Sequence, residues 1–140
     1  PPMNVLPVQV GAGATLMLGE RRLAVEGLMA TALPRLEGQH LTAGIRPEHL
    51  RVAPATNRNL AADVSHSEVL GNEQLVTCRL HDGDHLVQVR ANPSLMLTAG
   101  STIHLDADPE GWRLFDQSGE AVSLPEPPPR EGPEPQLPQL

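Results

Sequence analysis

Alternation of apolar and polar residues with a period of two is the feature that most restricts the fold of this chain. Near the N-terminus, Leu6, Val8 and Val10 are separated by single residues in this way. Such alternation is typical of a strand that buries one face and exposes the other. Because the pattern returns along most of the chain, with turn residues between the alternating segments, the sequence predicts an all-β protein.

Turn signals divide the alternating segments into hairpins. One hairpin is predicted over 16–25 and another over 75–89. In the second, Asp82-Gly83-Asp84 separates the two strands, and an Asp-Gly pair readily adopts the positive backbone dihedrals of a tight turn. Two further short strands are predicted at 101–105 and 112–115, separated by residues typical of a turn.

Helical signals are confined to two short segments, 26–36 and 47–50. The remaining pattern gives about eight to ten strands, a number that favours a small barrel or sandwich. The two hairpin-rich halves, about 1–53 and 60–122, are interpreted as two related barrel-like lobes. They form one predicted domain over residues 1–122.

The last part of the chain has a different composition. From Pro125 to Leu140, seven of sixteen residues are Pro, interleaved with Glu and Gly. Such a segment has little apolar surface to offset the entropy of ordering, so residues 123–140 are predicted to be a disordered tail. Since the sequence begins at Pro1 without an initiator Met, we expect it to be a piece of a longer protein.

Charge and composition exclude several functions. The formal net charge of −7 argues against a nucleic-acid partner, because binding to phosphates needs clustered positive charge. All ten basic residues are Arg, and without Lys a phosphate-binding P-loop is impossible. We therefore expect Gly11-Ala12-Gly13-Ala14 to be a plain turn, and this chain to have no catalytic residues, metal or cofactor of its own.

Three groups of residues have the side chains that chemistry would need, and each has a simpler interpretation. The segment His81–His85 resembles a metal-binding cluster, but its central residues suit a turn. Asp63, His66 and Ser67 supply the residue types of a hydrolytic triad, yet no glycines flank the Ser as in a nucleophile elbow. The lone Cys78 lies in a strand pattern and is expected to be buried.

A rigid corner at the end of a strand is predicted for the segment Gly44-Ile45-Arg46-Pro47-Glu48. Pro47 fixes its own backbone dihedral and forces Arg46 toward extended geometry. We expect an ion pair between Arg46 and Glu48 to hold the corner. The alternative is that Arg46 binds an oxyanion or a partner, because a guanidinium suits bidentate oxyanion recognition.

The sequence around this corner also resembles that of a known protein family. The stretch 41–50 resembles a signature in the C-terminal regulatory domain of the ATP-binding subunits of sugar and glycerol-phosphate ABC importers, the maltose-importer type. Three other segments resemble motifs of that family in the same order: Pro2-Met3-Asn4-Val5-Leu6, the loop Leu70-Gly71-Asn72 within 68–73, and Leu114-Phe115-Asp116-Gln117-Ser118-Gly119-Glu120. Val5 and Ser118 depart mildly from the family pattern. Together the motifs cover about residues 1–122.

The resemblance implies more than the pattern predicts. It implies two small oligomer-binding (OB) type β-barrel lobes that share strands and follow a nucleotide-binding domain. That upstream domain would bind ATP and Mg and hydrolyse ATP, while these regulatory domains form a homodimer. Two membrane-spanning permease subunits and an extracytoplasmic solute-binding protein would be its partners, and the subunit would lie on the cytoplasmic face of the cell membrane.

The resemblance also implies that the imported solute is sn-glycerol-3-phosphate or a related glycerophosphodiester, with a maltose- or trehalose-type sugar as the alternative. A different class of function also stays open. The chain could be a free-standing β-barrel that binds small anions, for which Arg46, Arg51 and Arg90 are the candidate contacts.

Overall fold

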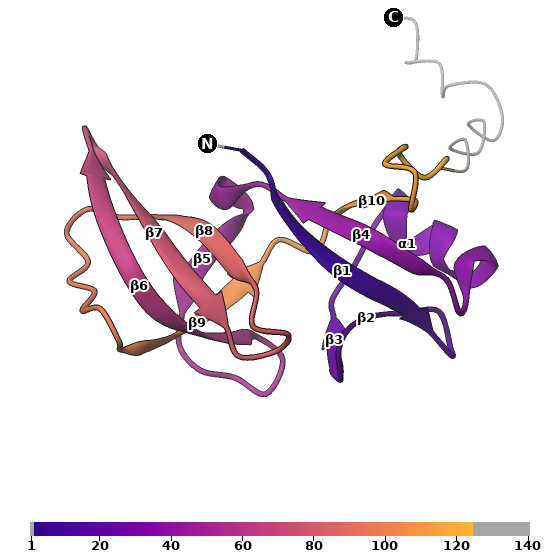
Figure 1. The fold of residues 1–140 in the computed structure, drawn as a ribbon, viewed down its shortest axis with the longest axis horizontal. Helices are drawn as coiled ribbons and strands as arrows, with labels where there is room; N and C mark the ends of the chain where they lie inside the picture. Colours follow the sequence, from indigo (N-terminus) through magenta and orange to yellow (C-terminus); the bar gives the residue numbers. More distant parts are fainter. Residues whose placement is uncertain (1, 125–140) are drawn as a thin grey trace, which may run out of the picture.

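The computed structural model describes residues 2–124, and in this range the chain is nearly all-β (Figure 1). Ten strands form two five-stranded sheets. The strands are β1 Asn4–Gly11, β2 Thr15–Leu18, β3 Arg21–Leu23, β4 His40–Ile45, β5 Leu50–Ala53, β6 Leu60–Leu70, β7 Glu73–Leu80, β8 Leu86–Ala91, β9 Thr102–Ala107 and β10 Arg113–Phe115. The predicted all-β class is therefore confirmed, whereas the tail from residue 125 on lies outside the described residues.

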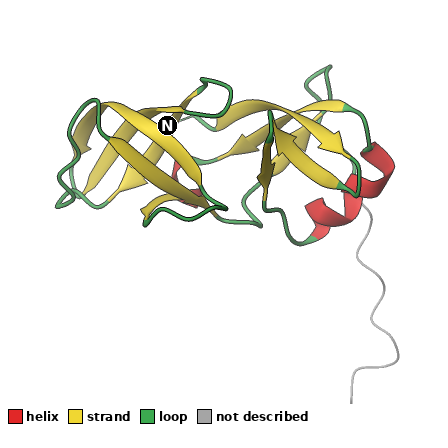
Figure 2. Cartoon of the chain, turned by 90° about the horizontal axis from the view of Figure 1, so that it is seen from below, coloured by secondary structure: helices red, strands yellow, loops and turns green. Residues whose placement is uncertain are grey.

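Within residues 2–124, helical structure is limited to the two segments that the sequence predicts. Helix α1, Leu28–Ala32, continues into the 3₁₀ turn η1, Leu33–Leu36, and both lie at one end of the molecule (Figure 2). A second 3₁₀ turn, η2, spans Pro47–His49 and follows β4. Within residues 2–124, no helix has the length and apolar character needed to cross a membrane.

The first sheet has the order β10-β4-β1-β2-β3, and all its pairings are antiparallel. Burial along β1 alternates as the sequence predicts, with Leu6, Val8 and Val10 buried. The β2–β3 hairpin turns at Gly19, whose φ of 57° requires the conformational freedom of glycine. The predicted hairpin over 16–25 is thus confirmed.

The second sheet has the order β5-β9-β6-β7-β8. Its β6–β7 hairpin turns through Gly71 and Asn72, with Leu70 paired to Glu73. Gly71 has a φ of 63°, as the first central position of a type II′ turn needs. The next hairpin, β7–β8, turns through the segment between Leu80 and Leu86, so the predicted hairpin over 75–89 is also confirmed.

Each half of the chain contributes one strand to the sheet formed mainly by the other half. β5 follows the first four strands in sequence but pairs with β9 in the second sheet. β10 lies near the end of the described chain and returns to pair with β4 in the first sheet. This exchange joins the lobes side by side, as Figure 1 shows, and it confirms the predicted class of two OB-like lobes with shared strands.

One continuous cluster of buried residues runs through both lobes. Most of its members are Leu, Val, Ile and Ala, and Trp112 is the largest side chain that is fully buried. Trp112 lines a small cavity of about 180 Å³ together with Leu23 of the first sheet and Leu60 and Leu105 of the second. The core therefore continues across the junction instead of ending at each lobe.

Candidate functional site

The corner after β4 is where the chain passes from the first sheet to the second. Ile45 and Pro47 are buried there, so the predicted corner is firmly packed. Gly44 is required by close approach: a Cβ added to it would lie 2.7 Å from the Met3 sulfur and 3.1 Å from a ring carbon of Phe115. This explains why the glycine occurs at the point where β1 and β10 flank β4.

The ion pair at this corner differs from the one expected. Glu48 does not pair with Arg46 but lies 3.4 Å from Nη1 of Arg90 on β8, and Nε of Arg90 lies 3.2 Å from a carboxylate oxygen of Glu73. Arg46 is exposed and, within residues 2–124, has no carboxylate partner. The reason is that Arg46 is still extended, whereas Glu48 lies in η2, which packs against β8.

The three arginines proposed as anion contacts have different surroundings. The charge of Arg90 is shared between two carboxylates, as described above. Arg51 is exposed on β5 and lines the small cavity beside Trp112. Arg46 stays at the exposed corner.

A second contact between the lobes is made by Asn4, the third residue of the N-terminal motif. Its Nδ2 donates to the backbone carbonyl of Gln88 at 2.9 Å, and the Gln88 N–H donates to its Oδ1 at 2.7 Å. Asn4 is only 8% exposed. A single amide side chain on β1 thus satisfies both backbone groups of one residue on β8.

A third contact links the β2–β3 hairpin to the second lobe through Arg21. Its Nε lies 3.2 Å from a carboxylate oxygen of Asp82, and its Nη1 donates to the backbone carbonyl of Asn57 at 3.1 Å. Asp82 belongs to the turn that resembles a metal cluster, so one of the carboxylates in that turn serves to join the lobes.

The rest of that turn also has structural partners. Asp84 lies 3.5 Å from the Arg79 guanidinium, and the His81 ring contacts Asp63 on β6 at 2.8 Å. Among the described residues, no group of three or more His, Cys, Asp or Glu side chains is arranged to hold a metal ion. The geometry of this segment is that of a turn, with Gly83 and Asp84 both at positive φ.

Asp63 takes part in a small network that the sequence did not suggest. Its Oδ1 accepts from Thr102 Oγ1 at 2.8 Å as well as contacting His81. The residues proposed with it as a triad, His66 and Ser67, lie exposed farther along β6, beyond an irregularity between Val64 and His66. The hydrogen bond with His81, and then that with Thr102, lower the pKa of Asp63.

This lowered pKa predicts a dependence of stability on pH. Because the folded pKa lies below the unfolded value of about 4, the contribution of Asp63 is complete above that value and is lost as the pH falls through the folded pKa. We expect the melting temperature of Asp63→Asn to be lower than that of the wild type at neutral pH, and the two to converge in acid. Thermal melts between neutral pH and strong acid measure this, and a constant difference would contradict it.

Cys78 is fully buried, and burial raises its pKa to about 11. Its sulfur contacts the backbone carbonyl of Val87 at 3.8 Å. The expectation that Cys78 is buried is therefore confirmed.

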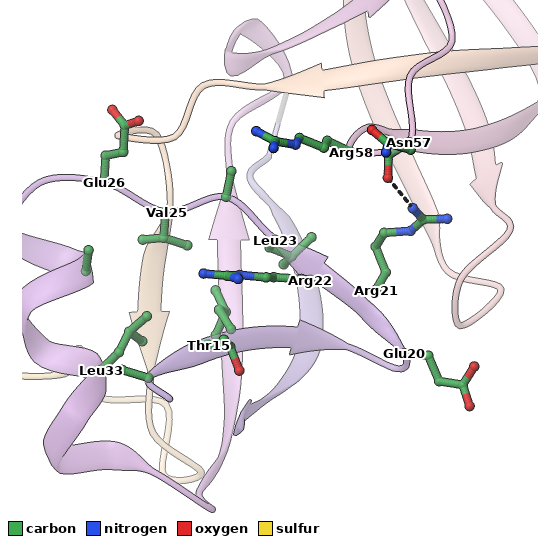
Figure 3. Close-up of a pocket in the computed structure, with 14 residues that line it drawn as sticks. Thr15, Glu20, Arg21, Arg22, Leu23, Val25, Glu26, Leu33, Asn57 and Arg58 are labelled. Atoms are coloured by element: carbon green, nitrogen blue, oxygen red, sulfur yellow. Dashed lines mark hydrogen bonds between the residues drawn. The ribbon is translucent and has the colours of Figure 1, made fainter. Parts of the chain in front are cut away.

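A cavity lies between the β2–β3 hairpin, helix α1 and the segment that joins β5 to β6. Its volume is about 710 Å³. Three arginines line it, Arg21, Arg22 and Arg58, together with Glu20 and Glu26. Figure 3 shows Arg22 and Arg58 extending in the same direction, toward the side of the view on which Glu26 lies, whereas Glu20 lies on the opposite side.

Sequence reasoning missed this cavity because Arg22 and Arg58 are 36 residues apart in the chain and belong to different lobes. The adjacent pair Arg21-Arg22 after a tight turn was the only local signal. Alternation along β3 places the two on opposite faces, yet both line the cavity, and Arg21 also contacts Asp82 and Asn57 of the second lobe.

Comparison with protein families gives two matches that overlap by a few residues. A model of the TOBE domain matches residues 43–115, and a model of the MalK OB fold domain matches residues 1–50. The matches meet at the corner where the chain crosses between the sheets. A solved structure of the cytoplasmic molybdate-binding protein ModG superposes with a TM-score of 0.63 at 18% identity, covering 81% of this chain and 95% of that one. This likeness concerns the fold.

Several curated proteins are similar in sequence. The sulfoquinovosyl glycerol transport ATP-binding protein SmoE of Agrobacterium fabrum is 30% identical over 86% of this chain. The sn-glycerol-3-phosphate import ATP-binding protein UgpC of Bordetella pertussis is 36% identical over 66%, and the maltose/maltodextrin import ATP-binding protein MalK of Yersinia pestis is 29% identical over 86%. The aligned regions span 33%, 24% and 33% of these relatives, respectively.

Proposed function

Because the chain belongs to the TOBE domain family and begins with a MalK-type OB fold, we propose that it is the regulatory and dimerisation domain of the ATP-binding subunit of a bacterial ABC importer. The observation that carries this proposal is the pair of family matches, which overlap over residues 43–50 and together extend from 1 to 115. The chain supplies no lysine for a P-loop, so ATP and Mg would be bound by another part of the subunit.

The physical role that we propose is that of a tether. Two such domains joined across a twofold axis would keep the attached ATPase domains together while these open and close. A short link of this kind raises the effective concentration for reclosure to roughly millimolar. The described contacts between the lobes support this role, since Asn4–Gln88, Arg21–Asp82 and Arg90–Glu48 hold the two lobes as one body.

The dimer is tested by sedimentation equilibrium of the 140-residue chain. We expect the weight-average mass to rise with concentration from that of a monomer toward that of a dimer. A chain that stays monomeric at every concentration would exclude a tether formed by this domain alone. Repeating the measurement at higher salt identifies any charged part of the interface, because exposed charges are screened by salt.

For the solute, we propose sn-glycerol-3-phosphate or a related glycerophosphodiester, in line with the similarity to UgpC at 36% identity. A sugar of the maltose or trehalose type is the second candidate, supported by the similarity to MalK over a longer part of the chain. Uptake of radiolabelled glycerol 3-phosphate and of maltose by cells that depend on the complete subunit distinguishes the two.

The remaining parts of the proposal follow from the same family. The complete subunit would hydrolyse ATP as a homodimer on the cytoplasmic face of the cell membrane, bound to two membrane-spanning permease subunits. An extracytoplasmic solute-binding protein would deliver the solute. Co-purification of the subunit with its permeases, with and without residues 1–122 of this chain, tests whether the domain is needed for assembly.

A further inference from the structure

The cavity between the β2–β3 hairpin and the second lobe is lined by more arginines than carboxylates, three against two. Of its three arginines, Arg21 is neutralised by Asp82. Arg22 and Arg58 have no carboxylate within 4 Å among residues 2–124. In a chain with a net charge of −7, two uncompensated guanidinium groups at one cavity are not the result of a generally basic surface.

The two guanidinium groups approach the cavity from different lobes. Arg22 lies on β3 of the first sheet, and Arg58 lies in the segment that leads into β6 of the second. In Figure 3 both side chains extend in the same direction, and neither Glu20 nor Glu26 comes within 4 Å of either guanidinium group. An anion that accepts hydrogen bonds from both would therefore bridge the lobes.

The rest of the wall is apolar. Leu23, Val25, Ala30 and Leu33 line the cavity beside the arginines. Its volume of about 710 Å³ lies within the range of known small-molecule sites, about 300–1,000 Å³. A charged group at the arginines and a short carbon skeleton against the apolar wall would fill such a site better than an inorganic ion.

From these observations we propose that this cavity binds a small organic phosphate, whose phosphate group accepts hydrogen bonds from Arg22 and Arg58. A phosphate monoester has three oxygens that carry charge, enough for two guanidinium forks. The proposal goes beyond the function proposed above, because it assigns a ligand site to the domain irrespective of which solute the complete subunit imports. Binding would stabilise one relative position of the lobes.

The test is isothermal titration calorimetry of the 140-residue chain with sn-glycerol 3-phosphate, inorganic phosphate and glycerol. We expect saturable binding of glycerol 3-phosphate, weaker binding of phosphate and none of glycerol. Arg22→Gln and Arg58→Gln should each weaken the binding of glycerol 3-phosphate about tenfold or more, since a hydrogen bond to a charged group is lost. Arg22→Lys should retain part of the affinity, because it keeps the charge but loses the fork.

Arg113→Gln is the matched control. It also removes an exposed arginine that has no carboxylate partner among the described residues, but on β10 outside this cavity, so the affinity of this variant should equal that of the wild type. Equal loss in all three glutamine variants would overturn the proposal, because binding would then follow net charge. It is overturned equally if the wild type binds none of the probes or if glycerol binds as well as its phosphate.

Discussion

Replacing Trp112 by Ala is expected to lower the free energy of unfolding by about 3–5 kcal/mol, the range for removing a buried aromatic side chain from a core. Trp112 is the largest fully buried residue, with 1% of its surface exposed. It lies beside Leu23 of one sheet and Leu60 and Leu105 of the other, so the space left by the indole would open at the junction of the lobes. Urea unfolding at equilibrium measures the loss.

Trp112→Phe separates packing from polarity. The indole Nε1 is buried and has no hydrogen-bond partner among residues 2–124, so losing its N–H removes no such bond. Phenylalanine also removes the cost of keeping that polar group from water, about 1–3 kcal/mol. We therefore expect this variant to lose far less stability than Trp112→Ala. A loss as large as that of the alanine variant would contradict this expectation.

Several of the strands could be predicted because they are encoded locally. In β1 and β7, apolar residues at every second position are buried: Leu6, Val8 and Val10 in β1, and Val76, Cys78 and Leu80 in β7. Two of the tight turns were predicted as well, since Gly19 and Gly83 lie at positive φ within the predicted hairpins, whereas the loop at Gly71 was identified only through the family resemblance. Local chemistry decides such features, so a single sequence is enough to find them.

The pairing between distant segments could not be predicted in the same way. β10 pairs with β4 although about 70 residues separate them, and no alternation or turn signal specifies that choice. The same holds for the partner of Glu48: Arg46 is two residues away, but the backbone directs Glu48 toward Arg90 on β8. The cavity of Arg22 and Arg58 depends on the same long-range arrangement, so its residues did not stand out.

Replacing Asn4 by Ala is the second change with a large expected effect, a loss of about 2 kcal/mol in the free energy of unfolding. The variant loses both hydrogen bonds to Gln88 and leaves the N–H and the carbonyl of that residue without their partner. β8 is an edge strand of its sheet, and Asn4 covers this part of the edge. Urea unfolding gives the loss, and hydrogen exchange of the Gln88 amide reports on the contact itself.

Two controls make the result specific to this contact. Asn4→Asp still accepts a hydrogen bond from the Gln88 N–H but cannot donate to its carbonyl, so we expect the amide to stay more protected than in Asn4→Ala. Asn72→Ala, at the exposed tip of the β6–β7 hairpin, should change stability by less than about 0.5 kcal/mol. If Asn4→Ala is equally silent, the amide bridge does not hold the lobes together. The rigidity that a tether needs would then have to come from the shared strands and the core around Trp112.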